Sequence, residues 1–193
     1  GRGVRVAVFD VQWYDAELRP DELGEYTTWD CQAHGTCEVP MDTLRPAFEY
    51  EEASHGVACA ETIRDVAPGV ELHLVRVNGL TTLENAAAWA VEHGVHLASM
   101  SMSFYGNSFH DGTGPVNAVV DRMAGGGVLL VSSAGNSAEE HWIEEFRDTD
   151  QDGFHDPLEE GISQQAVNLR WRDGTVYMAT MTDGTGDSAI SEI

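Results

Sequence analysis

The chain has 193 residues, of which 42% are hydrophobic, so it is long enough for one well-buried core and too short to indicate two. Its formal net charge is −23, from 33 acidic residues against 10 basic ones, and all ten basic residues are Arg. Such a charge repels nucleic acids and anionic membranes, which excludes both as expected partners, and it favours cations. An acidic proteome or a coding bias explains the charge as well as an adaptation to salt does.

Within these residues we expect neither a membrane-spanning helix nor a signal peptide. No run approaches the roughly 18 apolar residues that a membrane-spanning helix needs. The first residues also lack the apolar stretch of a signal peptide. We therefore expect the chain to begin as a processed or trimmed product.

Alternating strand and helix patterns predict an α/β fold. Short apolar segments bounded by turn residues predict buried strands at 4–9, 70–77, 95–102 and 127–133. Helical spacing predicts helices at 55–66, 83–92 and 115–124. This order implies right-handed crossovers and a mostly parallel β-sheet flanked by helices. Residues 1–137 would form this core within a single domain.

Two further regions have a different character. Residues 11–53 are irregular and rich in acidic residues, Trp and Pro, which predicts a long surface excursion that contains one short helix. Residues 138–193 begin with an acidic loop. They continue with β-patterned runs at 166–172 and 175–181 on either side of Asp173-Gly174, which predicts a C-terminal β-hairpin.

The three cysteines cannot all pair with one another. Cys31 and Cys37 flank a short loop that contains glycine, and a local disulfide is expected if the protein is exported. With His34 between them they also offer part of a metal site, although zinc normally takes four ligands or keeps an open catalytic position. Cys59 lies among small apolar residues, and for it we prefer a buried structural thiol over a reactive one.

Three polar residues of complementary chemistry lie at the ends of predicted elements. Asp10 ends the first strand, His55 begins a helix, and Asn136 follows the last core strand. Ligands of an open parallel sheet bind beyond the carboxyl ends of its strands, so these residues can converge there. A carboxylate that orients an imidazole, and a carboxamide that holds an oxyanion, are parts of a serine-peptidase site. Taken singly, each residue could instead serve a turn or cap a helix.

The contexts of these residues resemble the subtilisin-like serine peptidases (subtilases). The strand that ends at Asp10 is similar to that family's aspartate strand, although Val11-Gln12 replaces the usual Thr/Ser-Gly. Ser54-His55-Gly56 is similar to its histidine motif, with Val57 in place of the usual Thr. Segments 66–77, 100–103 and 131–137 resemble the helix exit with its next strand, the substrate-lining strand and the oxyanion-asparagine segment, so the resemblance covers about residues 3–137 in the family's order.

The resemblance implies a role for each residue. Asp10 would orient His55, His55 would act as general base and then acid, and Asn136 would stabilise the oxyanion, a contact worth about 3 to 4 kcal/mol. His34-Gly35-Thr36 repeats part of the histidine motif, but no helical pattern follows it, so His55 is the predicted catalytic residue. A polypeptide substrate would be bound by strand addition. The segments implied in this binding are Ser101, Met102, Ser103, Phe104, Ser132, Ser133, Ala134 and Gly135, next to Tyr105 where a Gly is common.

A nucleophilic serine in the family's Gly-Thr-Ser-x-Ala setting is missing. Ser137, Ser163, Ser188 and Ser191 do not fit it. We therefore expect an incomplete subtilisin-like domain, the N-terminal two-thirds of an exported serine endopeptidase, which would be inactive alone. The alternative is a catalytically inactive subtilase-like module that binds peptides or calcium. A nucleotide-binding doubly wound domain would need a glycine-rich turn after the first strand, and none is present.

An acidic segment has the spacing of a calcium loop, D-x-D-x-D-G-x5-E. Its carboxylates and the Phe154 carbonyl could surround Ca²⁺, although Pro157 is unusual inside such a loop. No second helix pattern follows, so the prediction is a lone calcium loop, and a solvated acidic turn is the alternative. The expected ligands are Asp148, Asp150, Asp152, Phe154, Asp156 and Glu159.

Overall fold

The computed structural model describes residues 1–32, 35–39, 41–42, 54–104, 107, 112–135, 142–145, 149, 170–172 and 175–178. They fall into two compact units, Gly1–Ser103 with Val116–Ala134, and Phe104–Pro115 with Gly135–Ile193. The described residues form one sheet of five strands and another of three. Among the helices of the described ranges, none has the length and apolar character needed to cross a bilayer.

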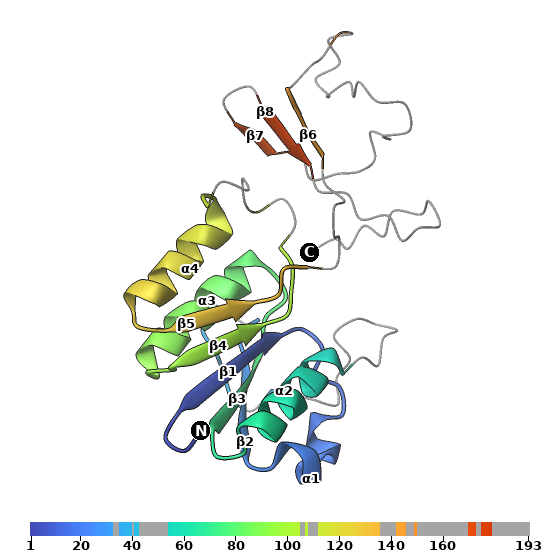
Figure 1. Ribbon diagram of the computed structural model, residues 1–193, viewed down its shortest axis with the longest axis vertical. Coiled ribbons are helices and arrows are strands. Elements are labelled where there is room, and N and C mark those ends of the chain that lie inside the picture. The colour runs from blue at the N-terminus through green and yellow to red at the C-terminus, as the bar shows by residue number, and fades with distance from the viewer. Residues whose placement is uncertain are drawn as a thin grey trace, which may run out of the picture. The chain divides into compact units, whose positions relative to one another are not determined.

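The five-stranded sheet of the first unit is parallel throughout, as the sequence predicts (Figure 1). Its strand order is β2-β3-β1-β4-β5, so β1 lies in the centre. Strands β3 (Glu71–Arg76), β4 (Leu97–Met100) and β5 (Leu129–Ser132) are shorter than their predicted runs. Strand β1 (Arg5–Asp10) has the predicted length, shifted by one residue, and the edge strand β2 (Tyr26–Asp30) is not among the predicted strands. The α/β prediction with a mostly parallel sheet and flanking helices is therefore confirmed.

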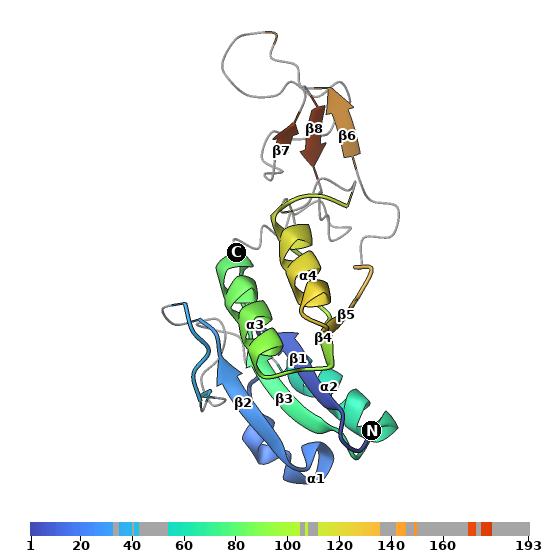
Figure 2. The ribbon, with the colours of Figure 1, turned by 90° about the vertical axis from the view of Figure 1, so that its left-hand side faces the viewer.

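Helices cover both faces of this sheet. In Figures 1 and 2, α2 (His55–Val66) lies on one face, and α3 (Leu80–Glu92) and α4 (Pro115–Gly125) lie on the other. Because side chains alternate along a strand, the even-numbered residues Val6, Val8, Leu72 and Leu74 pack in one cluster with Val57 and Ala60 of α2. Their odd-numbered neighbours face α3 and α4. Both faces of β1 are buried, which explains its unbroken apolar run.

The two ends of α2 are attached to the rest of the unit. At its C-terminal end, the Arg64 guanidinium donates to the carbonyls of Leu23, Glu25, Pro68 and Val70 at 2.7–3.0 Å. At its N-terminal end, the Gly56 N–H donates to the Gln12 carbonyl at 3.0 Å. The helix is thereby fixed relative to the turn that follows β1.

The prediction of a surface excursion for residues 11–53 is wrong for the part that the structure describes. This part contains a 3-10 helix, η1 (Ala16–Leu18), a short helix, α1 (Pro20–Leu23), and the edge strand β2. Trp13, Ala16, Leu23, Cys31 and Met41 are buried. These apolar residues enter the core one at a time between polar neighbours, and β2 itself, Tyr-Thr-Thr-Trp-Asp, is mostly polar because it is an edge strand. Neither feature produces a periodic pattern.

The structure confirms the local disulfide that is expected between two of the three cysteines. Cys31 and Cys37 form a disulfide next to an isolated bridge between Asp30 and Glu38. Their sulfurs are thus not available as metal ligands, which overturns the partial metal site, and His34 lies outside the described residues. Cys59 is a free thiol of intermediate exposure. The expectation that it is buried is wrong, because this position of α2 faces the open edge of the sheet beside His55.

The second unit contains the three-stranded antiparallel sheet, in the order β6-β8-β7. Its strands are β6 (Trp142–Glu145), β7 (Arg170–Arg172) and β8 (Thr175–Met178), and Arg172 is paired with Thr175. Asp173 and Gly174, for which the sequence predicts the hairpin turn, lie outside the described residues. So do Asp148, Asp150, Asp152, Phe154, Asp156 and Glu159 of the expected calcium loop.

Candidate active site

The carboxyl edge of the five-stranded sheet brings three chain segments side by side. Phe9 of β1 pairs with Met100 of β4, and Met100 pairs with Ser132 of β5. The residues that follow these three, Asp10, Ser101 and Ser133, therefore lie in a row across three neighbouring strands. Asp10 has an even number, like Val6 and Val8, so its side chain points to the face that α2 covers.

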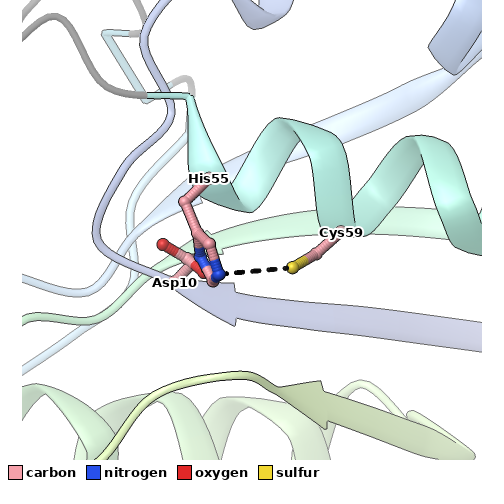
Figure 3. A group of neighbouring side chains, drawn as sticks. All are labelled: Asp10, His55 and Cys59. Atoms are coloured by element: carbon pink, nitrogen blue, oxygen red, sulfur yellow. Dashed lines mark hydrogen bonds and ion pairs between the residues drawn. The ribbon is translucent and has the colours of Figure 1, made fainter. Parts of the chain in front are cut away.

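His55 and Asp10 are in direct contact at this edge (Figure 3). His55 Nδ1 lies 2.6 Å from Asp10 Oδ2. An ionised carboxylate only accepts hydrogen bonds, so Nδ1 carries the proton, and in the neutral imidazole Nε2 presents its lone pair. The Asp10 side chain is 1% exposed and that of His55 is 49% exposed. A buried carboxylate thus holds a half-exposed imidazole in the tautomer that a general base requires.

Backbone donors complete the surroundings of the Asp10 carboxylate. Its Oδ1 accepts the N–H of Val11 at 2.8 Å and the N–H of Gln12 at 3.0 Å. With His55 Nδ1 on Oδ2, three donors satisfy a side chain that has almost no contact with water. Such a charge is costly to bury unless it is paired and hydrogen-bonded in this way. The carboxylate is therefore held in one orientation.

Gly56 allows α2 to approach this carboxylate. A Cβ atom at position 56 would lie 2.7 Å from Asp10 Cβ and 2.9 Å from the Gln12 carbonyl oxygen. Neither distance is compatible with normal packing, so only glycine fits here without a shift of the chain. The glycine of the His-Gly pair is explained by this close contact, which sets the distance between α2 and the end of β1.

Cys59 lies one helical turn after His55, and its Sγ is 3.9 Å from His55 Nε2 (Figure 3). Burial raises the pKa of the Cys59 thiol, a hydrogen bond with Ser101 opposes this shift, and the Asp10 carboxylate adds to it. Asp10, His55 and Cys59 also place metal-ligating atoms within 4.8 Å of one another. The Asp10 oxygens already accept three hydrogen bonds, with which a metal would have to compete. The group is better suited to proton transfer than to a metal cage.

The predicted substrate segments differ in exposure. Ser101 is exposed, while Met102, Ser103 and Phe104 are half-buried. The four residues Ser132, Ser133, Ala134 and Gly135 are exposed. Phe104 and Gly135 belong to the second unit. Asn136 and Tyr105 lie outside the described residues, so Asn136 stays a prediction from the sequence.

Comparison with known proteins agrees with this arrangement. The sequence profile of the Subtilase family (peptidase S8) matches residues 2–167. The chain belongs to this family. This subtilase chain is 30% identical over 156 residues to the minor extracellular protease Vpr of Bacillus subtilis (strain 168). It is 29% identical over 149 residues to the alkaline elastase YaB of Bacillus sp. (strain YaB).

These matches cover 74% and 71% of this subtilase chain, but only 19% and 35% of the two relatives. The chain thus corresponds to a minor part of the length of each. The family match extends beyond residue 137, where the resemblance in the sequence motifs ends, and it includes the acidic segment around residue 150.

Two residues of this subtilase site are missed by reasoning from the sequence. Cys59 could have been found, because residues four apart on a predicted helix share one face and His55 is four residues earlier. Trp13 gives no such signal. It is a single aromatic residue in an irregular segment, yet its indole Nε1 donates to the Asp10 carbonyl at 2.9 Å.

Proposed function

We propose that the chain is part of a serine endopeptidase of the subtilisin type, with Asp10 and His55 as two members of its catalytic triad. The observation that carries this proposal is the 2.6 Å contact between His55 Nδ1 and Asp10 Oδ2 at the carboxyl edge of a parallel sheet. In this role, His55 Nε2 removes the proton of a serine hydroxyl as its oxygen attacks the scissile carbonyl. The imidazolium, stabilised by Asp10, then gives that proton to the leaving amine.

Two components of the reaction come from outside the described site. The Asn136 carboxamide would donate to the oxyanion of the tetrahedral intermediate. Since no serine of the chain has the family's nucleophile setting, we propose that residues outside 1–193 supply the nucleophile. The polypeptide substrate would add as a strand between the segments after β4 and β5, where Ser101 and Ser133 lie on neighbouring strands.

Export and calcium binding are parts of the same proposal. The Cys31–Cys37 disulfide is typical of proteins in oxidising compartments. One relative is named an extracellular protease, which supports a secreted protein. The spacing of Asp148, Asp150, Asp152 and Glu159 supports a Ca²⁺ loop that stabilises the peptidase domain.

The test is peptide hydrolysis by the product of the complete gene. His55→Ala and Asp10→Asn should each lower kcat by several orders of magnitude, because both act on one proton transfer. The 193-residue chain alone should not react with a fluorophosphonate. Labelling of a serine in that chain, lost on His55→Ala, would show that the nucleophile lies within it.

The alternative function, a catalytically inactive module, makes an opposite prediction for the complete protein. It would bind peptides with no measurable turnover, and His55→Ala would leave this binding unchanged. The ordered Asp10–His55 pair favours the peptidase, because a module that only binds peptides does not need an oriented imidazole tautomer.

A further inference from the structure

Trp13 attaches the turn after β1 to the backbone of Asp10. Its indole Nε1 donates to the Asp10 carbonyl at 2.9 Å, and the residue is 1% exposed. The same carbonyl accepts the N–H of Val77 at 2.9 Å. A carbonyl oxygen has two lone pairs, so these two donors use both of them. The peptide plane that follows Asp10 is therefore held from two directions.

The indole also lies in the core that the His55 helix shares with the sheet. Trp13 belongs to the apolar cluster that includes Val57 and Ala60 of α2. One rigid side chain is thus hydrogen-bonded to the end of β1 and belongs to the same core cluster as α2, and the relative position of these two elements determines the distance from Asp10 Oδ2 to His55 Nδ1. The polar end holds the backbone of Asp10, and the apolar body is part of the core on which α2 lies.

Trp13 makes these contacts in the turn after Asp10, where the chain departs from the aspartate motif of the family. Val11-Gln12 replaces the Thr/Ser-Gly that usually follows the aspartate, and Val11 has no polar side-chain atom. The turn nevertheless directs the N–H groups of Val11 and Gln12 to Asp10 Oδ1. Trp13 supplies a buried side-chain donor at this point of the turn.

We propose that Trp13 is a positioning residue for the Asp10–His55 pair. Its N–H fixes the peptide after Asp10, and through it the direction in which Oδ2 points to His55 Nδ1. An effect of Trp13 on the reaction rate rests on the proposed peptidase function, whereas its effect on the geometry of the Asp10–His55 pair does not. A misplacement of about 1 Å at such a site costs on the order of 100-fold in rate.

The test compares Trp13→Phe with Trp29→Phe. Trp29 is the matched control, because its indole N–H also donates inside the unit, to His73 Nδ1 at 3.4 Å, but on the α3 face of the sheet. The first readout is the far-downfield NMR signal of the His55 Nδ1 proton in the 193-residue chain. We expect it to shift upfield and exchange faster in Trp13→Phe and to stay unchanged in Trp29→Phe. An unchanged signal in Trp13→Phe, or the same change in both variants, would overturn the inference.

The second readout is the kinetics of the complete protein. Trp13→Phe should lower kcat about 10- to 100-fold with KM unchanged, and Trp29→Phe should leave both as in the parent. If Trp13→Phe does not fold, benzothienylalanine at position 13 keeps the shape of the indole and removes only the donor. If no variant has peptidase activity but the His55 signal moves only with Trp13, the proposed function fails and the positioning role stands. Normal kcat together with an unmoved signal overturns the positioning role alone.

Discussion

Replacement of Gly56 by Ala tests how closely α2 and β1 must approach for the Asp10–His55 pair to form. The added Cβ would lie 2.7 Å from Asp10 Cβ and 3.0 Å from Asp10 Cγ. Carbon atoms pack favourably at about 3.5 to 4.0 Å, so the chain has to move by roughly 1 Å. Asp10 cannot yield easily, because hydrogen bonds hold both its carboxylate and its carbonyl. The shift therefore falls on α2 and on His55 at its first turn.

Overpacking of this kind costs about 1 to 3 kcal/mol of unfolding free energy. Urea denaturation of the 193-residue chain should show this loss in Gly56→Ala as a lower midpoint with an unchanged slope. Gly125→Ala is the matched control, since Gly125 ends α4 and a Cβ there meets nothing within 4 Å. It should be neutral or more stable by up to about 1 kcal/mol. Equal stability of Gly56→Ala and the parent would refute the contact on which the geometry of the pair depends.

Three further predictions concern pH, the free thiol and calcium. Burial lowers the pKa of His73, against the opposing effect of Glu71 and together with His93 and Arg5. The unfolded chain therefore binds the proton more readily, and the stability that the neutral His73 contributes should be full above about pH 6.5 and fall as the pH drops below it. His73→Phe should reduce this dependence of the unfolding free energy on pH, measured by denaturation at several pH values. An unchanged dependence would exclude His73 as its source. Alkylation of Cys59 should be slow at neutral pH and faster at higher pH, because the thiolate is the reactive form. The modification should abolish activity of the complete protein by filling the space beside His55 Nε2, whereas Cys59→Ser should stay active under the reagent. Full activity after complete alkylation would contradict this prediction. Calcium should bind at residues 148–159 with a calorimetric heat that Asp150→Ala removes. A calcium concentration of 100 times the Kd should raise the unfolding free energy by about 2.7 kcal/mol. No heat, or the same heat in the variant, would show that the segment is a solvated acidic turn and not a calcium site.

The elements that the sequence predicts well are those with both a periodic pattern and a clear stop. The α2 helix has the predicted bounds, His55–Val66, because Ala67-Pro68-Gly69 cannot continue it. The α3 helix begins at Leu80, before the predicted start at residue 83. The reason is that Thr82 Oγ1 accepts the N–H groups of Asn78 and Gly79 at 2.9 and 3.0 Å, an arrangement that apolar spacing does not reveal.

The elements that escaped prediction lack such a pattern. Strand β2 is held at the sheet edge by its pairing with β3, and its half-exposed side chains carry no continuous apolar run. Trp13 is buried because the turn after β1 folds back onto Asp10. Both depend on contacts between segments far apart in the sequence, or on the direction of one turn. The composition of a segment and the spacing of its apolar residues carry no information on such contacts or on the direction of a turn.

The Asp10–His55 pair could be anticipated because it follows from topology. A residue at the carboxyl end of a central parallel strand and the first residue of a helix that packs on that strand lie at one edge. The alternation of side chains then decides whether they share a face, and the even number of Asp10 places it with Val6 and Val8 on the side of α2. The distance of 2.6 Å requires more: a glycine at position 56 where a Cβ would collide, and a turn whose N–H groups point to Oδ1. The general position of the site is thus determined by the fold, and its reactive geometry by Gly56 and the few residues from Asp10 to Trp13.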